Sequence, residues 1–399
     1  MSMPGPSERP ATGFARRMSL GYAGVFAPLA VQLAFVPLWF EHVGFSPEAI
    51  GLLLGVPLLV RTLTTPPLAA LADRVDDRAR LYVAVALAAL LLSVGYLVGT
   101  GFAWVLAISI GIAIAMAMAV PLSDAIALSG VRRYAVSYGP IRLWGSVAFI
   151  GATFAAGWLV DWRGAAVVPL VLTACLAATV ATGMRLPRVA IDRMPSSAPP
   201  LRDPALLCAF AASALVVGSQ ATYYGFSSIH WSRLGFSANA IALLWSLGVV
   251  AEIVLFAVAD RLLGRPRPVL LIAAGAIVGA VRWATFTWEG GIGFYALNSL
   301  MHAGSFAAAH LGLQQLIAQR VDDRRQGAAQ GVAYAFSGPT MALATLAAGW
   351  LYAAHAVHAF WAAAAMCVAA LPLLALAVRS DRAAQPQRSR EGGETIEPE

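Results

Sequence analysis

Charged residues are scarce in this chain: they make up 12% of its 399 residues, whereas a soluble domain carries about 25%. Hydrophobic residues make up 59%, and the mean hydropathy is +0.73. So few charges cannot cover a water-facing surface, and most of the surface must therefore face lipid. Successive apolar runs of about 20 residues match the hydrocarbon core of a bilayer. Because these runs are continuous rather than alternating, the sequence predicts an all-α polytopic membrane protein and not a membrane barrel.

The chain also lacks the motifs of several other protein classes. Its three cysteines, Cys175, Cys208 and Cys367, lie singly in apolar runs without ligand spacing, so we expect core thiols, no metal and no cofactor. No Gly-x-x-x-x-Gly-Lys motif occurs, which excludes an ATP-driven pump made of this chain alone. We find neither a nucleophile–base pair nor a His-Glu-x-x-His set, so we expect no catalytic residues and no enzyme. Both tails are too short for the output domain of a sensor.

Lysine is absent, so all 27 basic residues are arginine, and one set of loops has almost none of them. That set holds only Arg163 and Arg233. The other loops and the tails hold the arginines at positions 9–17, 74–80, 132–133, 185–202, 261–267, 320–325 and 379–390. By the positive-inside rule, both termini are cytoplasmic and the protein lies in a bacterial inner membrane. This asymmetry also accounts for the net charge of +7, so we expect no nucleic-acid partner.

One stretch of the first half recurs near the middle of the chain. Gly44-Phe45-Ser46, an apolar helix and Ala72-Asp73-Arg74 return as Gly235-Phe236-Ser237, an apolar helix and Ala259-Asp260-Arg261. Both copies point the same way, so each half contains an even number of crossings, as in a transporter built from two parallel repeats.

We expect twelve transmembrane helices at residues 20–40, 47–71, 81–99, 103–128, 139–160, 165–184, 204–228, 237–260, 268–287, 291–317, 328–352 and 356–377.

These spans predict four segments. Residues 1–184 form an N-terminal six-helix bundle, and residues 185–203, rich in Pro and Ser, form a cytoplasmic linker. Residues 204–378 form the C-terminal six-helix bundle, and residues 379–399 form a disordered cytoplasmic tail.

The two copies of the repeat predict helix caps and a conformational latch. Ser46 is placed to cap the second helix, with Pro47 at its first position and Glu48 near the positive end of its dipole. At the other end, acidic residues are placed to pair with arginines of neighbouring helix ends, which would hold the bundles in one conformation. The alternative is a solvated turn, because exposed ion pairs contribute little. The latch residues are Asp73, Arg74, Arg78, Asp260, Arg261 and Arg265.

Three ionisable residues lie at membrane depth in the first half, where a charge is costly and is usually functional. Asp124 and Arg142 lie on consecutive antiparallel helices at similar depth, so they are placed to form a pair. In the functional interpretation Arg142 meets an anionic or hydroxylated substrate while Asp124 holds the arginine. The alternative is a structural ion pair. Arg61, in the middle of the second span, is either a ligand of a substrate carboxylate or a partner of Asp124.

The second half carries its own polar set. Glu252, Arg282 and His302 lie on three consecutive spans and are candidates for a proton relay, because a nearby arginine changes the proton affinity of a carboxylate. The alternatives are a static ion pair and a hydrogen-bonded core histidine. Tyr223 and Tyr224 suit a pocket for an aromatic or hydroxylated solute, although an interfacial aromatic belt is equally compatible with their position.

Several segments in both halves resemble the major facilitator superfamily, and more narrowly the 3-phenylpropionic acid transporter family, a neighbour of the lactose permease and nucleoside–proton symporter families. The segments that carry the resemblance are Gly51-Leu52-Leu53-Leu54-Gly55 with Arg61, Pro121-Leu122-Ser123-Asp124-Ala125, Tyr138-Gly139-Pro140-Ile141-Arg142-Leu143-Trp144-Gly145-Ser146, Tyr223-Tyr224-Gly225-Phe226-Ser227, Leu244-Trp245-Ser246-Leu247-Gly248-Val249-Val250-Ala251-Glu252 and Val281-Arg282-Trp283.

The resemblance implies proton-driven uptake by alternating access. It also implies that Asp124 and Arg142 contact substrate, and that Glu252, Arg282 and His302 serve coupling. The tenth span has no further acidic residue beside His302, so Glu252 and Asp124 are both candidates for the proton carrier.

We therefore expect a secondary active transporter that couples protons to the uptake of a small organic, aromatic acid such as 3-phenylpropionate. The alternatives are a nucleoside or sugar proton symporter and an exporter of small organic solutes. The expected partners are the solute, protons and the lipid bilayer, and we expect a monomer.

Overall fold

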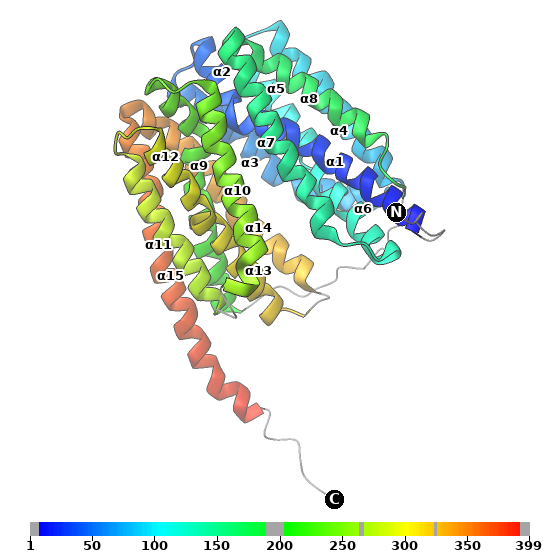
Figure 1. Cartoon of the computed structure of the whole chain (residues 1–399). Coiled ribbons are helices and arrows are strands. Elements are labelled where there is room, and N and C mark those ends of the chain that lie inside the picture. Colours follow the sequence, from blue (N-terminus) through cyan, green and yellow to red (C-terminus); the bar gives the residue numbers. More distant parts are fainter. Residues whose placement is uncertain (1–7, 189–202, 263–266, 323–324, 392–399) are drawn as a thin grey trace, which may run out of the picture. The chain divides into compact units, whose positions relative to one another are not determined.

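The computed structural model describes residues 8–188, 203–262, 267–322 and 325–391, and its regular elements are all helical (Figure 1). The helices of the first half are α1 (Glu8–Ala34), α2 (Val36–Val43), α3 (Pro47–Ala72), α4 (Arg78–Val98), α5 (Phe102–Met116), α6 (Ala119–Tyr134), α7 (Tyr138–Arg163), the 3-10 turn η1 (Ala165–Val167) and α8 (Val168–Gly183). Those of the second half are α9 (Pro204–Arg233), α10 (Ala238–Leu262), α11 (Pro268–Phe286), α12 (Ile292–His302), the π-helical turn η2 (Ala303–Ala307), α13 (Ala308–Arg320), α14 (Gln326–Ala354) and α15 (Ala356–Glu391).

These elements match the twelve expected spans one for one, because three of the spans are broken helices. The first is α1 and α2, which bend by 42°. The fourth is α5 and α6, and the tenth is α12, η2 and α13. Within the described residues nine helices are long and apolar enough to cross a membrane, and the bent pair makes ten. The other two spans, at α12–α13 and α14, are rich in Gly, Ala and polar residues. The predicted fold class is confirmed.

The predicted cap of the second span is confirmed as well. The backbone N–H of Ala49 donates to Ser46 Oγ at 3.4 Å, Pro47 opens α3, and Glu48 lies in its first turn. The cap satisfies one of the backbone donors that every helix start leaves unpaired.

The chain divides into two compact units that do not follow the two halves of the sequence. One consists of residues 1–195, 222–249 and 345–356, and the other of residues 196–221, 250–344 and 357–399. The first unit therefore includes one end each of α9, α10 and α14. The boundaries expected for the bundles and the linker stay a prediction, and residues 189–202 of the linker lie outside the described residues.

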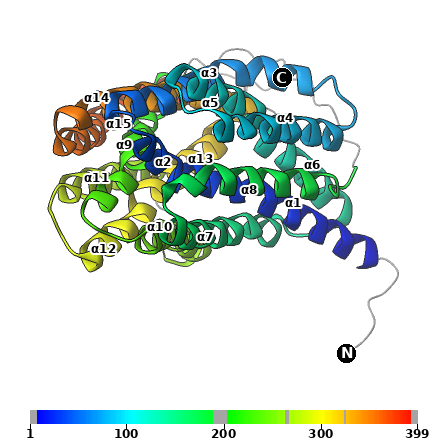
Figure 2. The same ribbon diagram turned by 90° about the horizontal axis from the view of Figure 1, so that it is seen from above.

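In the first unit, α1 packs along both α7 and α8, α4 packs on α8, and α3 packs on α5 (Figure 2). Small residues permit the close approach of α1 and α8, since a Cβ on Gly24 would meet the side chain of Thr182. The hydroxyl of Thr179 donates to the Gly24 carbonyl at 2.7 Å across the same interface. This packing places one face of α1, with the fully buried Tyr22, against the helices that carry Asp124 and Arg142.

At the end of the first unit where arginines are few, side chains join segments far apart in sequence. Asp161, near the end of α7, accepts from the backbone N–H of Ala238 at 2.6 Å and of Asn239 at 3.0 Å, and so caps α10. Arg233 Nε lies 2.8 Å from Glu41 Oε1. Gly51 and Gly349 let α3 and α14 touch, because a Cβ on either would come within 2.8 Å of the other's Cα. These contacts hold the ends of α10, α9 and α14 in the first unit.

In the second unit the central contact is α11 against α13. Gly275 faces Ala309, and Gly312 faces the carbonyl of Pro268, so the two helices approach closely. The core around this crossing contains Leu206, Phe210, Ile272, Leu316 and Leu374.

α15 continues as a helix to Glu391, beyond residue 378, where the sequence predicts a disordered tail to begin. Its Ala, Arg and Gln residues have favourable helix propensity.

We expect Gly275→Val to destabilise the second unit. A Cβ at this position would lie 2.7 Å from the Ala309 Cβ and 3.0 Å from the Ser305 carbonyl, which leaves no room for a side chain. Overpacking of this kind costs about 1–3 kcal/mol. The measurement is the thermal melting temperature of the detergent-purified protein. Gly151→Val is the control, because Gly151 has no neighbour within 4 Å of its Cβ position. Equal melting temperatures for the two variants would contradict the close crossing.

Candidate functional site

The first polar cluster at membrane depth is built around the carboxylate of Asp124 on α6. Tyr22 of α1 donates to Asp124 Oδ1 at 2.5 Å, and Tyr138 at the start of α7 donates to the same oxygen at 2.9 Å. The two phenol rings meet edge to face, with centroids 6.2 Å apart. Both hydroxyls therefore converge on one oxygen of the carboxylate, which accepts two hydrogen bonds.

The guanidinium of Arg142 lies beside this cluster on an aromatic face. Its Cζ is 4.0 Å from the centroid of the Phe26 ring and 5.4 Å from that of Tyr22. Phe26 follows Tyr22 by one helical turn, so both rings come from one face of α1. Gly145, one turn after Arg142 on α7, leaves the space for this packing. A Cβ there would lie 3.0 Å from Arg142 Nη1 and 2.9 Å from the Phe26 ring.

Asp124 and Arg142 come together as expected, but through tyrosine and not as an ion pair. Among the described residues neither side chain forms a salt bridge, and Tyr22 contacts both of them. A guanidinium stacked on a ring keeps its N–H edge available, and that edge can donate two hydrogen bonds to one carboxylate.

Arg61 on α3 is exposed, and its guanidinium likewise makes no ion pair or hydrogen bond with another described residue. Both roles left open for Arg61, as a ligand of a substrate carboxylate and as a partner of Asp124, stay predictions.

The second cluster is built around Arg282 on α11, which is fully buried. Its guanidinium donates to the Asn298 carbonyl at 3.0 Å and to Gln220 Oε1 at 3.2 Å, and it lies 3.4 Å from Ser305 Oγ. In return, Asn298 Nδ2 donates to the Arg282 carbonyl at 2.8 Å. Neutral acceptors from α9, α12 and η2 thus surround a buried charge, as such a charge requires.

His302 connects Arg282 to Glu252. Its Nδ1 lies 3.1 Å from Arg282 Nη1, and its Nε2 lies 4.0 Å from Glu252 Oε2 on α10. Since a guanidinium can only donate, Nδ1 must accept, and we assign the imidazole proton to Nε2, which faces the carboxylate. The structure therefore brings together all three residues that the sequence selected for a relay, with the histidine in the middle.

The π-helical turn η2 begins directly after His302. Such turns are rare and occur frequently at functional sites. Here the turn carries Ser305 towards Arg282 and Phe306 onto His302, whose ring stacks on that of Phe306 with centroids 5.2 Å apart. His310 stacks on the far side of Phe306 at 6.0 Å. The turn therefore sets which side chains of this span face the arginine.

The two tyrosines of α9 lie in an aromatic cluster of the first unit. Tyr223 is buried, with its ring 4.8 Å from that of Trp245 and 5.8 Å from that of Trp231. Tyr224 is half-buried and stacks on Trp245 at 6.0 Å. Their expected contact with substrate stays a prediction, and Tyr224 is the more accessible of the two.

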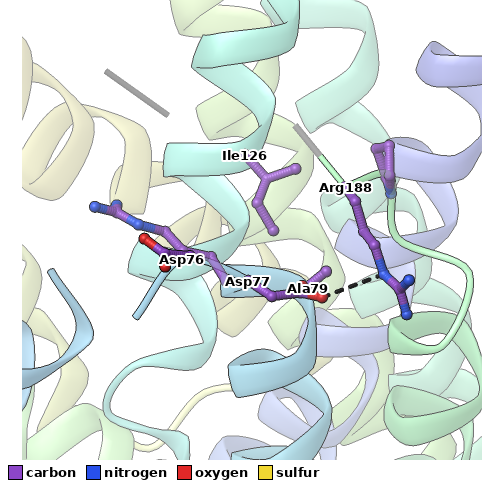
Figure 3. A pocket seen from close by; sticks show the side chains of 7 residues that line it. Asp76, Asp77, Ala79, Ile126 and Arg188 are labelled. Atoms are coloured by element: carbon purple, nitrogen blue, oxygen red, sulfur yellow. Dashed lines mark ion pairs between the residues drawn. The ribbon is translucent and has the colours of Figure 1, made fainter. Parts of the chain in front are cut away.

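At the arginine-rich end of the first unit, the turn between α3 and α4 holds a small pocket of about 240 Å³ (Figure 3). Asp77 accepts from the backbone N–H of Arg80 at 3.0 Å and so caps α4. It also lies 3.3 Å from Arg188 Nε, which ties the segment after α8 to this turn.

Of the expected latch residues, Asp73 pairs with Arg78 at 2.9 Å, across the turn between the two helices. Arg74 and Arg261 are exposed. The side chain of Asp260 and the whole of Arg265 lie outside the described residues.

Sequence reasoning missed several residues of these sites. Tyr22 and Phe26 lie in an apolar helix, where tyrosine and phenylalanine are common, so no local signal marks them. Gly145 lies inside a segment that carries the family resemblance, but nothing in that segment indicates its packing role. Tyr138 lies inside a segment that carries the family resemblance, and this resemblance could have indicated that Tyr138 belongs to the site. Gln220 lies on a different span from Arg282, and spacing along the chain does not indicate their contact.

A polytopic helical protein with two charged clusters at membrane depth belongs to the class of membrane transporters. The model of the MFS_1 like family matches residues 15–363, and the chain therefore belongs to this family of the major facilitator superfamily. It is a multi-pass secondary transporter of small molecules and not an enzyme.

Three similar proteins agree with this assignment. The chain is 34% identical to the "Probable 3-phenylpropionic acid transporter" of Escherichia coli (strain K12), over 90% of this chain and 96% of that protein. It is 27% identical to the "Maltose permease" of Geobacillus stearothermophilus, over 91% of this chain and 93% of that protein. The crystal structure of the nucleoside transporter NupG shares the fold, with a TM-score of 0.77 and 13% identity, over 92% of this chain and 98% of that chain.

We expect Arg282→Lys to lower the stability of the second unit although the charge is kept. A lysine ammonium cannot reach the Asn298 carbonyl, Gln220 and His302 together from one fork, so at least one buried acceptor loses its donor. Such a loss costs about 1–3 kcal/mol. The measurement is the melting temperature in detergent. Arg163→Lys is the control, because Arg163 also packs on a tryptophan, at 4.1 Å, but lies exposed at a helix end. An unchanged melting temperature for Arg282→Lys would show that the network is not structural.

Proposed function

We propose that this protein couples protons to the uptake of a small aromatic carboxylic acid, such as 3-phenylpropionate, by alternating access. In this proposal it acts as a monomer in a bacterial inner membrane, with both termini in the cytoplasm. The observation that carries the proposal is the guanidinium of Arg142, which lies on the Phe26 ring without an ion pair among the described residues. A cation kept at membrane depth without a fixed anion suits a ligand that supplies the anion.

The surroundings of Arg142 support an aromatic acid in particular. The rings of Phe26 and Tyr22 lie next to the guanidinium, and the half-buried Tyr138 meets Tyr22 edge to face. Aromatic pairs add about 0.5–1.5 kcal/mol beyond burial. Arg61 supplies a second cation in the same unit. The name of the Escherichia coli relative points to the same class of solute.

Proton coupling is assigned to the second cluster, with Glu252 as the carrier. Its side chain is 26% exposed, whereas Arg282 is fully buried, so Glu252 is the more accessible ionisable group of the two. His302 turns its protonated nitrogen to the carboxylate and its acceptor nitrogen to the arginine. In this arrangement the histidine transmits the field of the arginine, and Glu252 gains or loses the proton. Asp124 is the weaker candidate because two phenols already occupy one of its oxygens.

The ends of the helices supply the contacts that alternate. Glu41–Arg233 and the Asp161 cap of α10 close the arginine-poor end, and each joins a residue of the first half to one of the second. When that end opens, we propose that a latch forms at the other end from Asp73, Arg74, Arg78 and the corresponding Asp260, Arg261 and Arg265. The pair of Asp73 with Arg78 is the part of this latch that lies within one turn.

A sugar or nucleoside symporter is the second candidate, favoured by the donors and acceptors of Tyr22, Tyr138 and Asp124, which suit a hydroxylated solute. The Geobacillus stearothermophilus relative carries the name of a sugar permease. Counterflow in proteoliposomes separates the two: labelled 3-phenylpropionate exchanges under the first proposal, and maltose or a nucleoside exchanges under the second.

We expect Arg142→Ala to abolish substrate-driven proton entry. Proteoliposomes carry a pH-sensitive dye, and 3-phenylpropionate is added outside. The wild type acidifies the lumen faster than protein-free vesicles, which measure the leak of undissociated acid. Arg163→Ala is the matched control, since Arg163 also lies on α7 and stacks on an aromatic ring but is exposed at the helix end. Wild-type flux in a correctly inserted Arg142→Ala protein would overturn the substrate role. No wild-type flux above the leak would discard the aromatic acid.

We expect Glu252→Gln to lose uphill accumulation and to keep exchange of internal for external substrate. Glutamine imitates the protonated carboxyl but cannot release a proton, and exchange needs no net proton movement. The measurement is accumulation under an imposed pH gradient, together with counterflow of labelled substrate. Glu289→Gln, at an exposed position of the same unit, is the control and should retain both activities. Loss of counterflow together with accumulation would assign Glu252 to a structural contact.

A further inference from the structure

We propose that Gly145 and Phe26 are positioning residues that hold the Arg142 guanidinium in the orientation that binds the substrate carboxylate. This inference rests on the proposed function and extends it to residues that never touch the carboxylate. The Arg142 guanidinium lies against the space that a side chain at Gly145 would need. The Phe26 ring covers one face of the guanidinium.

The geometry at Gly145 is specific. A methyl group there would lie 3.0 Å from Arg142 Nη1 and 2.9 Å from Phe26 Cδ2, closer than side-chain carbons normally approach such atoms. Gly145 is buried, and its backbone is an ordinary helical one with a negative φ, so the lack of a side chain serves space and not conformation. Residues three apart on a helix are neighbours, which places the gap directly beside the arginine stem.

Gly145 leaves space for the guanidinium, and the Phe26 ring attracts the guanidinium and holds it there. A guanidinium 4.0 Å from a ring centroid is attracted by the ring face, and this attraction is stronger where water is excluded. Arginine has many rotatable bonds, so an unconstrained side chain would lose affinity through the entropy of ordering when it binds. Packing between the ring and the Gly145 gap orders the side chain beforehand. The two N–H groups of its edge then meet a carboxylate without rearrangement.

The substitution Gly145→Ala is expected to displace the Arg142 guanidinium. The new methyl group would lie 2.9 Å from Phe26 Cδ2 and 3.0 Å from Arg142 Nη1, so it pushes on both the ring and the guanidinium. Both atoms belong to side chains and not to the backbone, so the contact between ring and guanidinium shifts while the helix stays. The fold and the charge are kept, but the orientation is lost. The affinity for a carboxylate falls, whereas contacts made by the rest of the solute persist.

The test compares Gly145→Ala with Gly151→Ala, a glycine of the same helix with open space at its Cβ position. Initial rates of 3-phenylpropionate uptake give KM and maximal rate, and competition by the neutral 3-phenylpropionamide gives its inhibition constant. For Gly145→Ala we expect KM to rise about tenfold or more, as for a displaced charge-assisted contact. The maximal rate per inserted protein and the inhibition by the amide should stay near the wild-type values. Gly151→Ala should match the wild type throughout.

Phe26 provides a second, independent pair of variants in case Gly145→Ala inserts poorly. Phe26→Leu removes the ring and should raise KM for the acid, whereas Phe26→Tyr keeps a ring face and should restore it. The positioning role is overturned if Gly145→Ala behaves like Gly151→Ala, or if Phe26→Leu and Phe26→Tyr behave alike, while Arg142→Ala is inactive. If Arg142→Ala transports like the wild type, the proposed function itself has failed, and this result is distinguishable from the other two.

Discussion

The arrangement of this protein depends on the cost of placing polar groups where a lipid bilayer surrounds them. A charged side chain at the centre of a membrane helix costs at least about 2.5 kcal/mol, and every backbone group without a partner adds more. The backbone meets this constraint by forming helices through almost all of the described chain. The ionisable side chains of the two clusters meet it through partners on other helices. The partners that each charge has found therefore indicate how it is used.

The arginines at membrane depth in the two units, Arg142 and Arg282, have different kinds of partner. Arg142 rests on an aromatic face, and the nearby carboxylate of Asp124 is held by two phenols, so the opposite charges stay separate. Arg282 is enclosed by neutral acceptors and reaches a carboxylate through His302. A cation with an available edge suits an anion that arrives and leaves. An enclosed cation supplies a constant field to a neighbour that titrates. In the proposed function, binding and coupling are therefore separated by the kind of partner that each arginine has, and not by the presence of the charge.

Apolar runs predicted the positions of the helices of all twelve expected spans, although the spans at α12–α13 and α14 are less apolar than the other ten. The charged members of both clusters were also recognisable, since a polar residue inside an apolar run is conspicuous. The residues that orient them were not. The roles of Tyr22 and Gly145 depend on α1 packing against α7, and sequence spacing carries no information about that choice of partner. The breaks at Phe35 and at η2 were missed for the same reason, because both segments read as continuous apolar runs.

The repeat that organises the sequence predicts two equal halves, yet its two copies begin their helices in different ways. Ser46 caps α3 from within its own turn. At the matching position, Ser237 Oγ accepts from the backbone N–H of Ala240. In addition, the carboxylate of Asp161 on α7 accepts from the first two backbone N–H groups of α10. The local serine cap is thus present in both copies, and α10 has a second cap from α7 in addition. A local cap is independent of the rest of the chain, whereas the cap from Asp161 lasts only while α7 and α10 stay together. In the proposed alternating access, this second cap is a contact that can form and break, and α3 has no such contact from Ser46.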